Sequence, residues 1–346
     1  MKKLFLTGAG GFVGHHTLAH LLKTTDWSIV ITDSFRHYGT SSRIRAVFEE
    51  LPHFRNRVKV ITHDLVTPFD SVTLREIGHI DYVINMASGS HVDRSISHPR
   101  SFVENNVALQ LTMLDFVRMN PEIEIFLHVS TDEVYGPAPI GEDHTEWSTI
   151  VPSNPYSASK AAQEALSISY WRTFGIPLVI TNTMNIIGER QDVEKFTPLT
   201  ISRILAGKRV PVHALRKGND WIAGSRFYLH ARNQADALRF IIKHHESGKL
   251  RYSDGLSRPE RYNVRGELEI ANDKMVELIA ELMNADMARS YVDYVNVEGA
   301  RPGHDLRYAL SGEKLKRLGW VPPVSLRESL KRTIQWTLDN REWLIQ

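Results

Sequence analysis

Short apolar runs alternate with longer segments of helical periodicity in the first half of the chain. The runs that predict strands are Leu4–Thr7, Ile29–Thr32, Val58–Thr62, Tyr82–Asn85, Ile125–Val129 and Leu178–Thr181. The clearest helical segments between them lie near Gly11–Lys23, Pro99–Met119 and Pro155–Phe174. This alternation is typical of βαβ units, whose parallel strands are covered by helices on both faces. The pattern therefore predicts an α/β fold with a doubly wound parallel sheet.

Beyond about residue 182 the alternation stops and shorter elements follow. Helices are expected near Thr197–Ala206, Arg232–His245, Asn272–Asn284 and Leu326–Asn340, a strand near Val210–His213, and an irregular stretch around Arg301–Leu310. We therefore expect a first domain over residues 1–182 and a smaller C-terminal α/β lobe over residues 183–346. Segments near 210–245 are expected to return to the first domain.

The composition is that of an ordinary globular protein. Of the 346 residues, 42 are Lys or Arg and 40 are Asp or Glu, a balance that argues against a nucleic-acid partner and a basic membrane-binding surface. No apolar segment approaches the ~20 residues needed to cross a bilayer, so a cytoplasmic location is the default expectation. The absence of cysteine excludes disulfides and thiolate chemistry, and the histidines show no metal-ligand spacing, so no metal is expected.

Three glycines follow the first predicted strand at the spacing G-x-x-G-x-x-G. They are Gly8, Gly11 and Gly14, with Phe12 and Val13 between the last two. Glycines here let the chain turn tightly and approach a pyrophosphate, whose charge the N-terminus of the next helix stabilises. A turn that serves packing alone is the alternative. We expect a dinucleotide site and, with it, a Rossmann-type fold.

Acidic residues after the next two strands indicate which dinucleotide binds. Asp33 ends the second strand about 20 residues beyond the last glycine, where a carboxylate accepts hydrogen bonds from an adenosine ribose, which favours NAD. Arg36 is near enough to meet a 2′-phosphate, so NADP stays open, and both residues alternatively belong to a solvated loop. Asp64 is expected to face the adenine, although a lone aspartate is equally a turn former, and Leu65 is expected among the cofactor-binding residues. Residues 1–182 are thus expected to bind NAD.

Tyr156 and Lys160 share one face of a predicted helix because they are four residues apart. A neighbouring ammonium lowers the pKa of a phenol from its ordinary value of about 10, which makes Tyr156 a base near neutral pH. An isolated pair of this kind is more often a surface pair. Here it accompanies the glycine turn, so we expect both residues to serve cofactor binding and catalysis.

A second polar cluster, Thr131, Asp132 and Glu133, follows the predicted strand Ile125–Val129. Ligands of open α/β sheets bind at the carboxyl ends of the strands, so these side chains are expected to face the crevice. Two adjacent carboxylates beside a hydroxyl suggest divided acid and base roles. The alternative is that the cluster only caps a turn.

Several motifs together resemble the extended short-chain dehydrogenase/reductases over nearly the whole chain. Beside the glycine motif, they are Ser90–Ile96, Ser130–Gly136, Pro155–Ala161 and Arg301–Asp305. Within that family the Thr-Asp-Glu run is similar to that of the nucleotide-sugar 4,6-dehydratases, whereas related epimerases commonly have another residue where this chain has Asp132. The resemblance implies an NAD-dependent lyase that dehydrates a nucleoside-diphosphate hexose, such as dTDP-glucose or a UDP-sugar, to a 4-keto-6-deoxy sugar.

The resemblance also implies a role for each catalytic residue. Tyr156, aided by Thr131 and Lys160, takes the proton of the sugar 4-hydroxyl while C4 is oxidised. Glu133 removes the C5 proton, and Asp132 protonates the departing 6-hydroxyl. Hydride returned from the cofactor to C6 restores NAD. Asp132 must therefore be protonated, and Glu133 ionised, near neutral pH.

Substrate contacts are implied by the same resemblance at Ser90, His91, Asn185, Glu194, Lys195, Arg226 and Arg301. The two arginines match positions where the family binds the diphosphate, a use that suits a bidentate donor. The chain departs from the dehydratase pattern at Gly89, Ile186–Ile187 and Phe227–Tyr228, and segment 216–225 carries extra residues. These departures leave the nucleotide and the sugar open.

Two other functions stay open. An NAD-dependent C4 epimerase of nucleotide sugars would use the same scaffold, and a non-catalytic NAD-binding scaffold or sensor would need only the cofactor site. Intact Tyr156 and Lys160 count against the second. As the family implies, the two long helices Pro99–Met119 and Pro155–Phe174 suit a four-helix homodimer interface.

Overall fold

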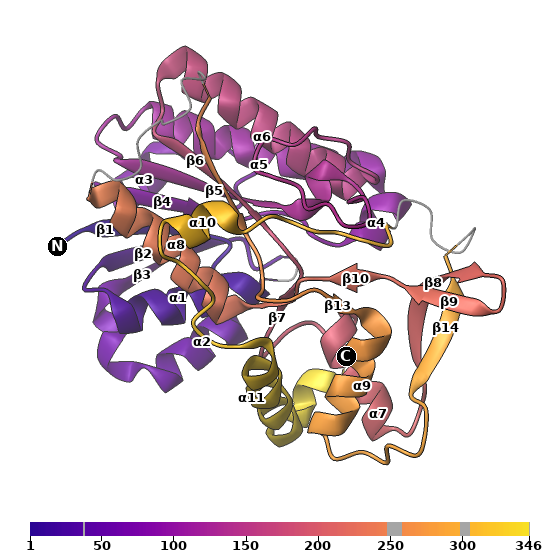
Figure 1. Ribbon diagram of the computed structural model, residues 1–346. Helices are drawn as coiled ribbons and strands as arrows, with labels where there is room; N and C mark the ends of the chain where they lie inside the picture. The colour runs from indigo at the N-terminus through magenta and orange to yellow at the C-terminus, as the bar shows by residue number, and fades with distance from the viewer. Residues whose placement is uncertain (37–38, 248–257, 298–304, 346) are drawn as a thin grey trace.

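A seven-stranded parallel sheet forms the centre of the computed structural model, which describes residues 1–36, 39–247, 258–297 and 305–345 (Figure 1). The strand order is β12-β6-β5-β4-β1-β2-β3. The strands are β1 (Lys3–Thr7), β2 (Ser28–Asp33), β3 (Val58–Thr62), β4 (Tyr82–Asn85), β5 (Ile125–Thr131), β6 (Leu178–Thr183) and β12 (Glu260–Val264). The chain winds outward from β1 to β3, then crosses to β4 and winds the other way. The predicted doubly wound, Rossmann-type α/β fold is confirmed.

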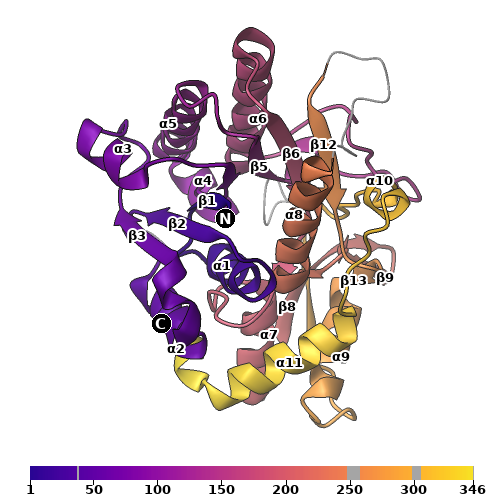
Figure 2. The same ribbon diagram turned by 90° about the vertical axis from the view of Figure 1, so that its left-hand side faces the viewer.

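Helices cover both faces of this sheet because successive side chains of a strand point to opposite faces. One face packs against α1 (Phe12–Thr24), α2 (Ser41–Glu50) and α8 (Ala231–Glu246). The other packs against α3 (Ser71–Ile77), α5 (Pro99–Arg118) and α6 (Pro155–Phe174), with the short α4 (Val92–Ser97) beside α5 and α6. Figure 2 shows α1 and α8 below the sheet and α5 and α6 above it. In β5, Leu127 belongs to the first core and Phe126 to the second.

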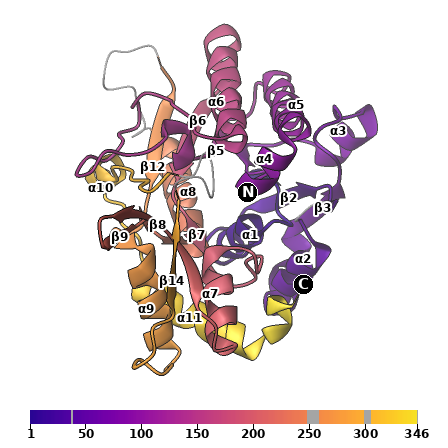
Figure 3. The same ribbon diagram turned by 90° about the vertical axis from the view of Figure 1, so that its right-hand side faces the viewer.

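A smaller lobe with its own apolar core holds most of the second half of the chain (Figures 1 and 3). Its elements are α7 (Phe196–Leu205), β8 (Val210–Lys217), β9 (Asp220–Ala223), α9 (Asn272–Leu282), β14 (Val292–Asn296), α11 (Leu326–Asp339) and the 3-10 turn η3 (Arg341–Leu344). Two short pairs, β7 (Ile186–Ile187) with β11 (Leu229–His230) and β10 (Ser225–Arg226) with β13 (Ile270–Ala271), complete it. The short helix α10 (Glu313–Arg317) lies beside β12. Among the described residues, none of the helices has the length and apolarity that a membrane span requires.

The helices and strands expected from the sequence end within two residues of the observed ones, except that β8 continues to Lys217. The segments that return to the first domain differ from the expected 210–245. Helix α8 does pack on α1, but β8 pairs with β9 and β14 in the lobe. The returning strand is β12, which pairs with β6. The division of the chain into two domains stays a prediction.

Strand β12 could not be predicted from an apolar run because two of its five residues are buried polar groups. Arg261 and Asn263 are at most 1% exposed. Asn263 Nδ2 donates to the carbonyl of His144, and Arg261 pairs with a glutamate of α6. A buried polar group is tolerated when it has such partners, but the partners are distant in sequence and give no local signal.

Candidate active site

A cavity of about 850 Å³ opens at the carboxyl ends of strands β1 to β6, facing segment 191–195 of the smaller lobe. It brings together the residues predicted for the cofactor, the chemistry and most of the substrate contacts. The predicted residues that line it are Gly8, Gly11, Phe12, Val13, Gly14, Asp33, Asp64, Leu65, Ser90, His91, Thr131, Asp132, Glu133, Tyr156, Lys160, Asn185, Glu194 and Lys195. Arg226 is not among the described residues that line it. Arg301 lies outside the described residues.

The glycine turn has the shape of a pyrophosphate cradle. Gly8 adopts a left-handed φ of +68°, which favours glycine. A Cβ built on Gly14 would overlap the carbonyl oxygen of Gly8, so α1 packs directly on the turn. No described side chain caps the start of α1. Its first N–H groups are therefore available to an anion, and the turn fits the diphosphate of NAD.

Replacing Gly14 with Ala should destabilise the protein and weaken NAD binding, because the new methyl group meets backbone that cannot give way. Overpacking of this kind costs roughly 1–3 kcal/mol. Gly11→Ala is the graded control, since its Cβ would lie 3.1 Å from the Gly8 carbonyl oxygen. Urea unfolding and calorimetric titration with NAD measure both effects. Equal unfolding free energies for the two variants would contradict the packing argument.

Asp33 lines the cavity beside the glycine turn. Its carboxylate accepts hydrogen bonds from the backbone N–H of Gly10 at 3.0 Å and of Phe35 at 2.9 Å. Arg36, the residue that leaves NADP open in the sequence, forms an ion pair with Asp64. With that guanidinium neutralised and two carboxylates nearby, the site suits a ribose hydroxyl better than a 2′-phosphate.

The candidate catalytic hydroxyls and carboxyls lie close together where β5 ends. Thr131 caps the 3-10 turn η2 (Asp132–Tyr135) and donates its hydroxyl to Asp132 Oδ1 at 2.9 Å. The Thr131 hydroxyl also lies near Tyr156, where it acts to lower the pKa of the phenol. Glu133 accepts a hydrogen bond from Asn154 Nδ2 at 3.3 Å. Four candidate catalytic groups therefore occupy one corner of the cavity.

Helix α6 starts at a fixed point because its first turn is closed by a capping box. The Asn154 side chain accepts from the N–H of Ser157, and Ser157 Oγ accepts from the N–H of Asn154. This holds Tyr156 in the wall of the cavity, and Lys160 follows one turn later. Asn154 has two tasks here, since its Nδ2 also orients Glu133.

The two adjacent carboxyls differ in their protonation. Burial, and then the nearby Glu133, raises the pKa of Asp132 to about 7. Burial also raises the pKa of Glu133, but the Asn154 hydrogen bond and the charges of Arg226 and Lys195 counteract it. Asp132 is thus the better proton donor near neutral pH and Glu133 the better base.

The pKa of Tyr156 is not lowered as its spacing from Lys160 predicts. Burial, and then Glu133, raises the pKa of Tyr156, while burial lowers that of Lys160 to about 7. The Lys160 ammonium donates to the carbonyl of Val129 at 2.9 Å and to Gln163 Oε1 at 2.6 Å. The hydroxyl of Thr131 is the contact that counteracts the rise in the pKa of Tyr156.

On the substrate side, His91 Nε2 lies 2.9 Å from Glu194 Oε1 and links the start of α4 to the smaller lobe. Lys195 follows, with its N–H bonded to the carbonyl of Asp192. Arg226 is 3% exposed and donates to the carbonyls of Leu306 and Asp305, at 2.5 Å and 2.7 Å. In the structure Arg226 therefore holds the backbone at residues 305–306 in place. Its contact with a diphosphate stays a prediction.

Residues of α5 that no motif indicates also line the cavity, among them Phe102 and Asn105. The ring of Phe102 lies edge-on to that of Tyr156, with centroids 6.2 Å apart. A Cβ on Gly89 would lie 3.0 Å from the Phe102 ring. The departure from the dehydratase pattern at Gly89 therefore matches a tightly packed aromatic wall beside Tyr156.

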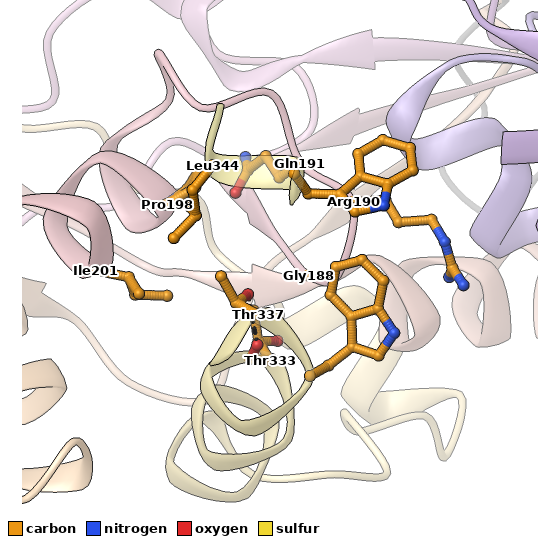
Figure 4. A pocket seen from close by; sticks show the side chains of 10 residues that line it. Gly188, Arg190, Gln191, Pro198, Ile201, Thr333, Thr337 and Leu344 are labelled. Atoms are coloured by element: carbon orange, nitrogen blue, oxygen red, sulfur yellow. Dashed lines mark hydrogen bonds between the residues drawn. The ribbon is translucent and has the colours of Figure 1, made fainter. Parts of the chain in front are cut away.

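A second cavity, of about 10 Å³, lies between α11 and the segment that contains Gly188 and Arg190 (Figure 4). It has room for roughly one water molecule and is too small for a substrate. Gln191 lines both this cavity and the large one. The small cavity is thus part of the packing behind segment 191–195, which faces the large cavity.

The comparisons with known proteins agree with this geometry. Residues 5–333 match the sequence model of a protein family described as GDP-mannose 4,6 dehydratase. The dTDP-glucose 4,6-dehydratase of Salmonella typhimurium is 31% identical over 99% of this chain and 94% of its own. The corresponding enzyme of Neisseria meningitidis serogroup B is 32% identical over 99% of this chain and 95% of its own.

Solved structures show the same similarity. DesIV, a dTDP-glucose 4,6-dehydratase from Streptomyces venezuelae crystallised with NAD bound, is 30% identical over 99% of both chains, with a TM-score of 0.82. A UDP-glucuronic acid 4-epimerase from Bacillus cereus reaches a TM-score of 0.81 over 98% of this chain and 99% of its own, but at 20% identity it shares the fold alone.

Proposed function

The chain belongs to the GDP-mannose 4,6-dehydratase family within the extended short-chain dehydrogenase/reductases, and on this basis we propose that it is an NAD-dependent nucleotide-sugar 4,6-dehydratase. The observation that carries the proposal is Asp132 beside Glu133, a proton donor next to a base in the cavity that the NAD-binding glycines also line. Such an enzyme removes water from a nucleoside-diphosphate hexose and leaves a 4-keto-6-deoxy sugar. A C4 epimerase would leave Asp132 without a role.

Gly8, Gly11 and Gly14 would hold the diphosphate of NAD and Asp33 its adenosine ribose. NAD, when bound, supplies the hydride acceptor for C4 and the hydride donor for C6. The chain's own contribution at the 4-hydroxyl is Tyr156, which takes the proton.

The carboxyl groups of Glu133 and Asp132 carry out the proton transfers at C5 and at the 6-hydroxyl. Glu133 takes the C5 proton and later returns it to C5, and Asp132 gives its proton to the 6-hydroxyl, which leaves as water. The Thr131 hydroxyl lies near Tyr156 and donates to Asp132, and this arrangement supports a path by which the proton taken from O4 restores Asp132. With this transfer the proton balance of one turnover closes.

A product-mass screen tests the proposal. The purified protein is incubated with dTDP-glucose, UDP-glucose and UDP-N-acetylglucosamine, and products are read by mass spectrometry. We expect a product lighter than its substrate by one water, with dTDP-glucose as the first candidate because relatives of that name share nearly the whole chain. An isomer of unchanged mass would instead establish an epimerase. NAD binding without turnover of a broad panel would favour a scaffold.

The dehydration rate should follow a bell-shaped pH profile. Asp132 acts in its protonated form, so the rate should fall as pH rises through its pKa of about 7. Glu133 acts as the anion, so the rate should fall as pH drops through its raised pKa. Steady-state rates from acidic to alkaline buffer measure the profile.

Lys160 also loses its proton near pH 7, so it would lower the rate on the alkaline side of the pH profile, as Asp132 does. Single-turnover oxidation at C4, followed by NADH absorbance, separates the two because it does not use Asp132. A dehydration rate that is flat across pH 7 would contradict the assigned protonation of Asp132.

We further propose that the enzyme works as a homodimer in the cytoplasm. Helices α5 and α6 lie side by side (Figure 2), and the same pair from a second copy would complete a four-helix interface. Nucleotide sugars and NAD are metabolites of the cytoplasm. Sedimentation equilibrium of the purified protein tests the dimer, and a monomer mass would reject it.

A further inference from the structure

A buried ion pair lies directly behind the active site. Glu164, on α6, is 0% exposed, and Arg261, on β12, is 1% exposed. Arg261 Nη2 lies 2.7 Å from Glu164 Oε2, and the guanidinium also lies 4.4 Å from the centre of the Trp147 ring. Two charges are seldom kept in a protein interior for stability alone, because desolvation offsets most of their attraction.

The pair is connected to the first residue of the catalytic turn, Thr131, through Asn182 of β6. Asn182 Nδ2 donates to Glu164 Oε1 at 2.7 Å and to the carbonyl of Thr131 at 2.9 Å. Asn182 is itself fully buried. The position of the Thr131 carbonyl, and with it the end of β5, therefore depends on an amide that Glu164 orients.

The pair is also connected to Tyr135, the last residue of the turn 131–135. The hydroxyl of Tyr135 accepts a hydrogen bond from Arg261 Nη1 at 3.2 Å and lies 3.2 Å from Asn182 Oδ1. The Tyr135 ring is 2% exposed, so this contact is shielded from water. Asp132 and Glu133 lie between the two attached residues.

Glu164 also faces Lys160, one helical turn earlier on α6. The titratable groups around Lys160 are Tyr156 and Glu164 on the same helix and His128 on β5, with Arg261 behind them. The Glu164 carboxylate counteracts the lowering of the Lys160 pKa by burial. Removing the carboxylate charge should therefore make Lys160 lose its proton at lower pH.

We propose that the ion pair between Glu164 and Arg261 positions the catalytic turn 131–135 by fixing Thr131 through Asn182 and Tyr135 through its hydroxyl. Neither charged residue is among the described residues that line the cavity, so both act through these intermediates. The catalytic meaning of the turn rests on the proposed function. The positioning itself does not, and it is testable without any substrate.

Hydrogen exchange, read by mass spectrometry, tests the positioning directly. Glu164→Gln keeps the shape and the acceptor for Asn182 but leaves Arg261 without its counter-charge. We expect exchange of the amides in segment 131–136 to rise about tenfold, as a charged hydrogen bond of ordinary strength predicts. Asp236→Asn is the matched control, since Asp236 lies on α8, away from the turn, and its carboxylate contacts His20, Arg239 and Trp320.

Unchanged exchange in this segment would overturn the proposal. An equal rise in the Asp236→Asn control, or a uniform rise along the whole chain, would do the same. If Glu164→Gln does not fold, the double variant Glu164→Leu with Arg261→Met removes both charges together, a change that buried ion pairs often tolerate. The same local rise in exchange is expected from it.

Kinetics supply the second readout. Glu164→Gln should lower kcat about tenfold with little change in KM, and the alkaline limb of its pH profile should move to lower pH. Glu164→Asp keeps the charge and should return that limb towards its original position. A Glu164→Gln enzyme with the original kcat and pH profile would reject the proposal. If the unaltered protein converts no sugar, the proposed function fails while hydrogen exchange still decides the positioning.

Discussion

Replacing Asp132 with Asn should lower the rate of dehydration by about 10²–10⁴-fold, the usual contribution of a general acid, while C4 oxidation continues. Asn has the same size and still accepts the hydrogen bond of Thr131, but it has no proton to give to the 6-hydroxyl. NADH should accumulate in a single turnover because the oxidised sugar cannot lose water. Absorbance of NADH and the mass of the quenched products measure the two steps.

Asp70→Asn is the control for this change. Asp70 caps α3 at the surface, and Asn caps a helix equally well, so turnover should be unchanged. The assignment of Asp132 as the acid is wrong if Asp132→Asn dehydrates within tenfold of the original rate. It is also wrong if C4 oxidation is lost to the same extent.

Replacing Tyr156 with Phe should lower the rate of C4 oxidation by about 10²–10⁴-fold, because it removes the base for the 4-hydroxyl. Here no NADH should accumulate, the opposite of the result for Asp132→Asn. Tyr170→Phe is a matched control on the same helix, since its hydroxyl contacts Asp115 instead of the cavity. Rapid NADH formation by Tyr156→Phe would place the base elsewhere.

The central strands could be predicted because a parallel strand buried on both faces is a continuous apolar run. Strands β1, β4 and β5 have this character, and the motifs that follow them meet at the same edge of the sheet. Strand β12 could not be predicted in this way. Its Arg261 is compatible with burial only because Glu164, far away in sequence, lies against it.

The candidate site residues could be chosen from the sequence because strand ends determine where they lie. Their electrostatics could not, because the spacing of Tyr156 and Lys160 says nothing about burial. Burial shifts the pKa values of both groups more than they shift each other. The contact of Arg226 with the backbone at Leu306 likewise depends on a fold that no local motif encodes.

The late position of β12 in the chain has a consequence for biosynthesis. At ordinary translation speeds, the ribosome needs roughly 4–15 s to pass from Thr183 to Glu260. During this interval the outer edge of β6 has no neighbouring strand in the nascent chain and Glu164 lacks Arg261, its partner in the buried ion pair. An open edge is a template for pairing with other chains, so this is the interval in which a chaperone has most to protect. A fragment that stops at residue 182 would keep this edge open permanently.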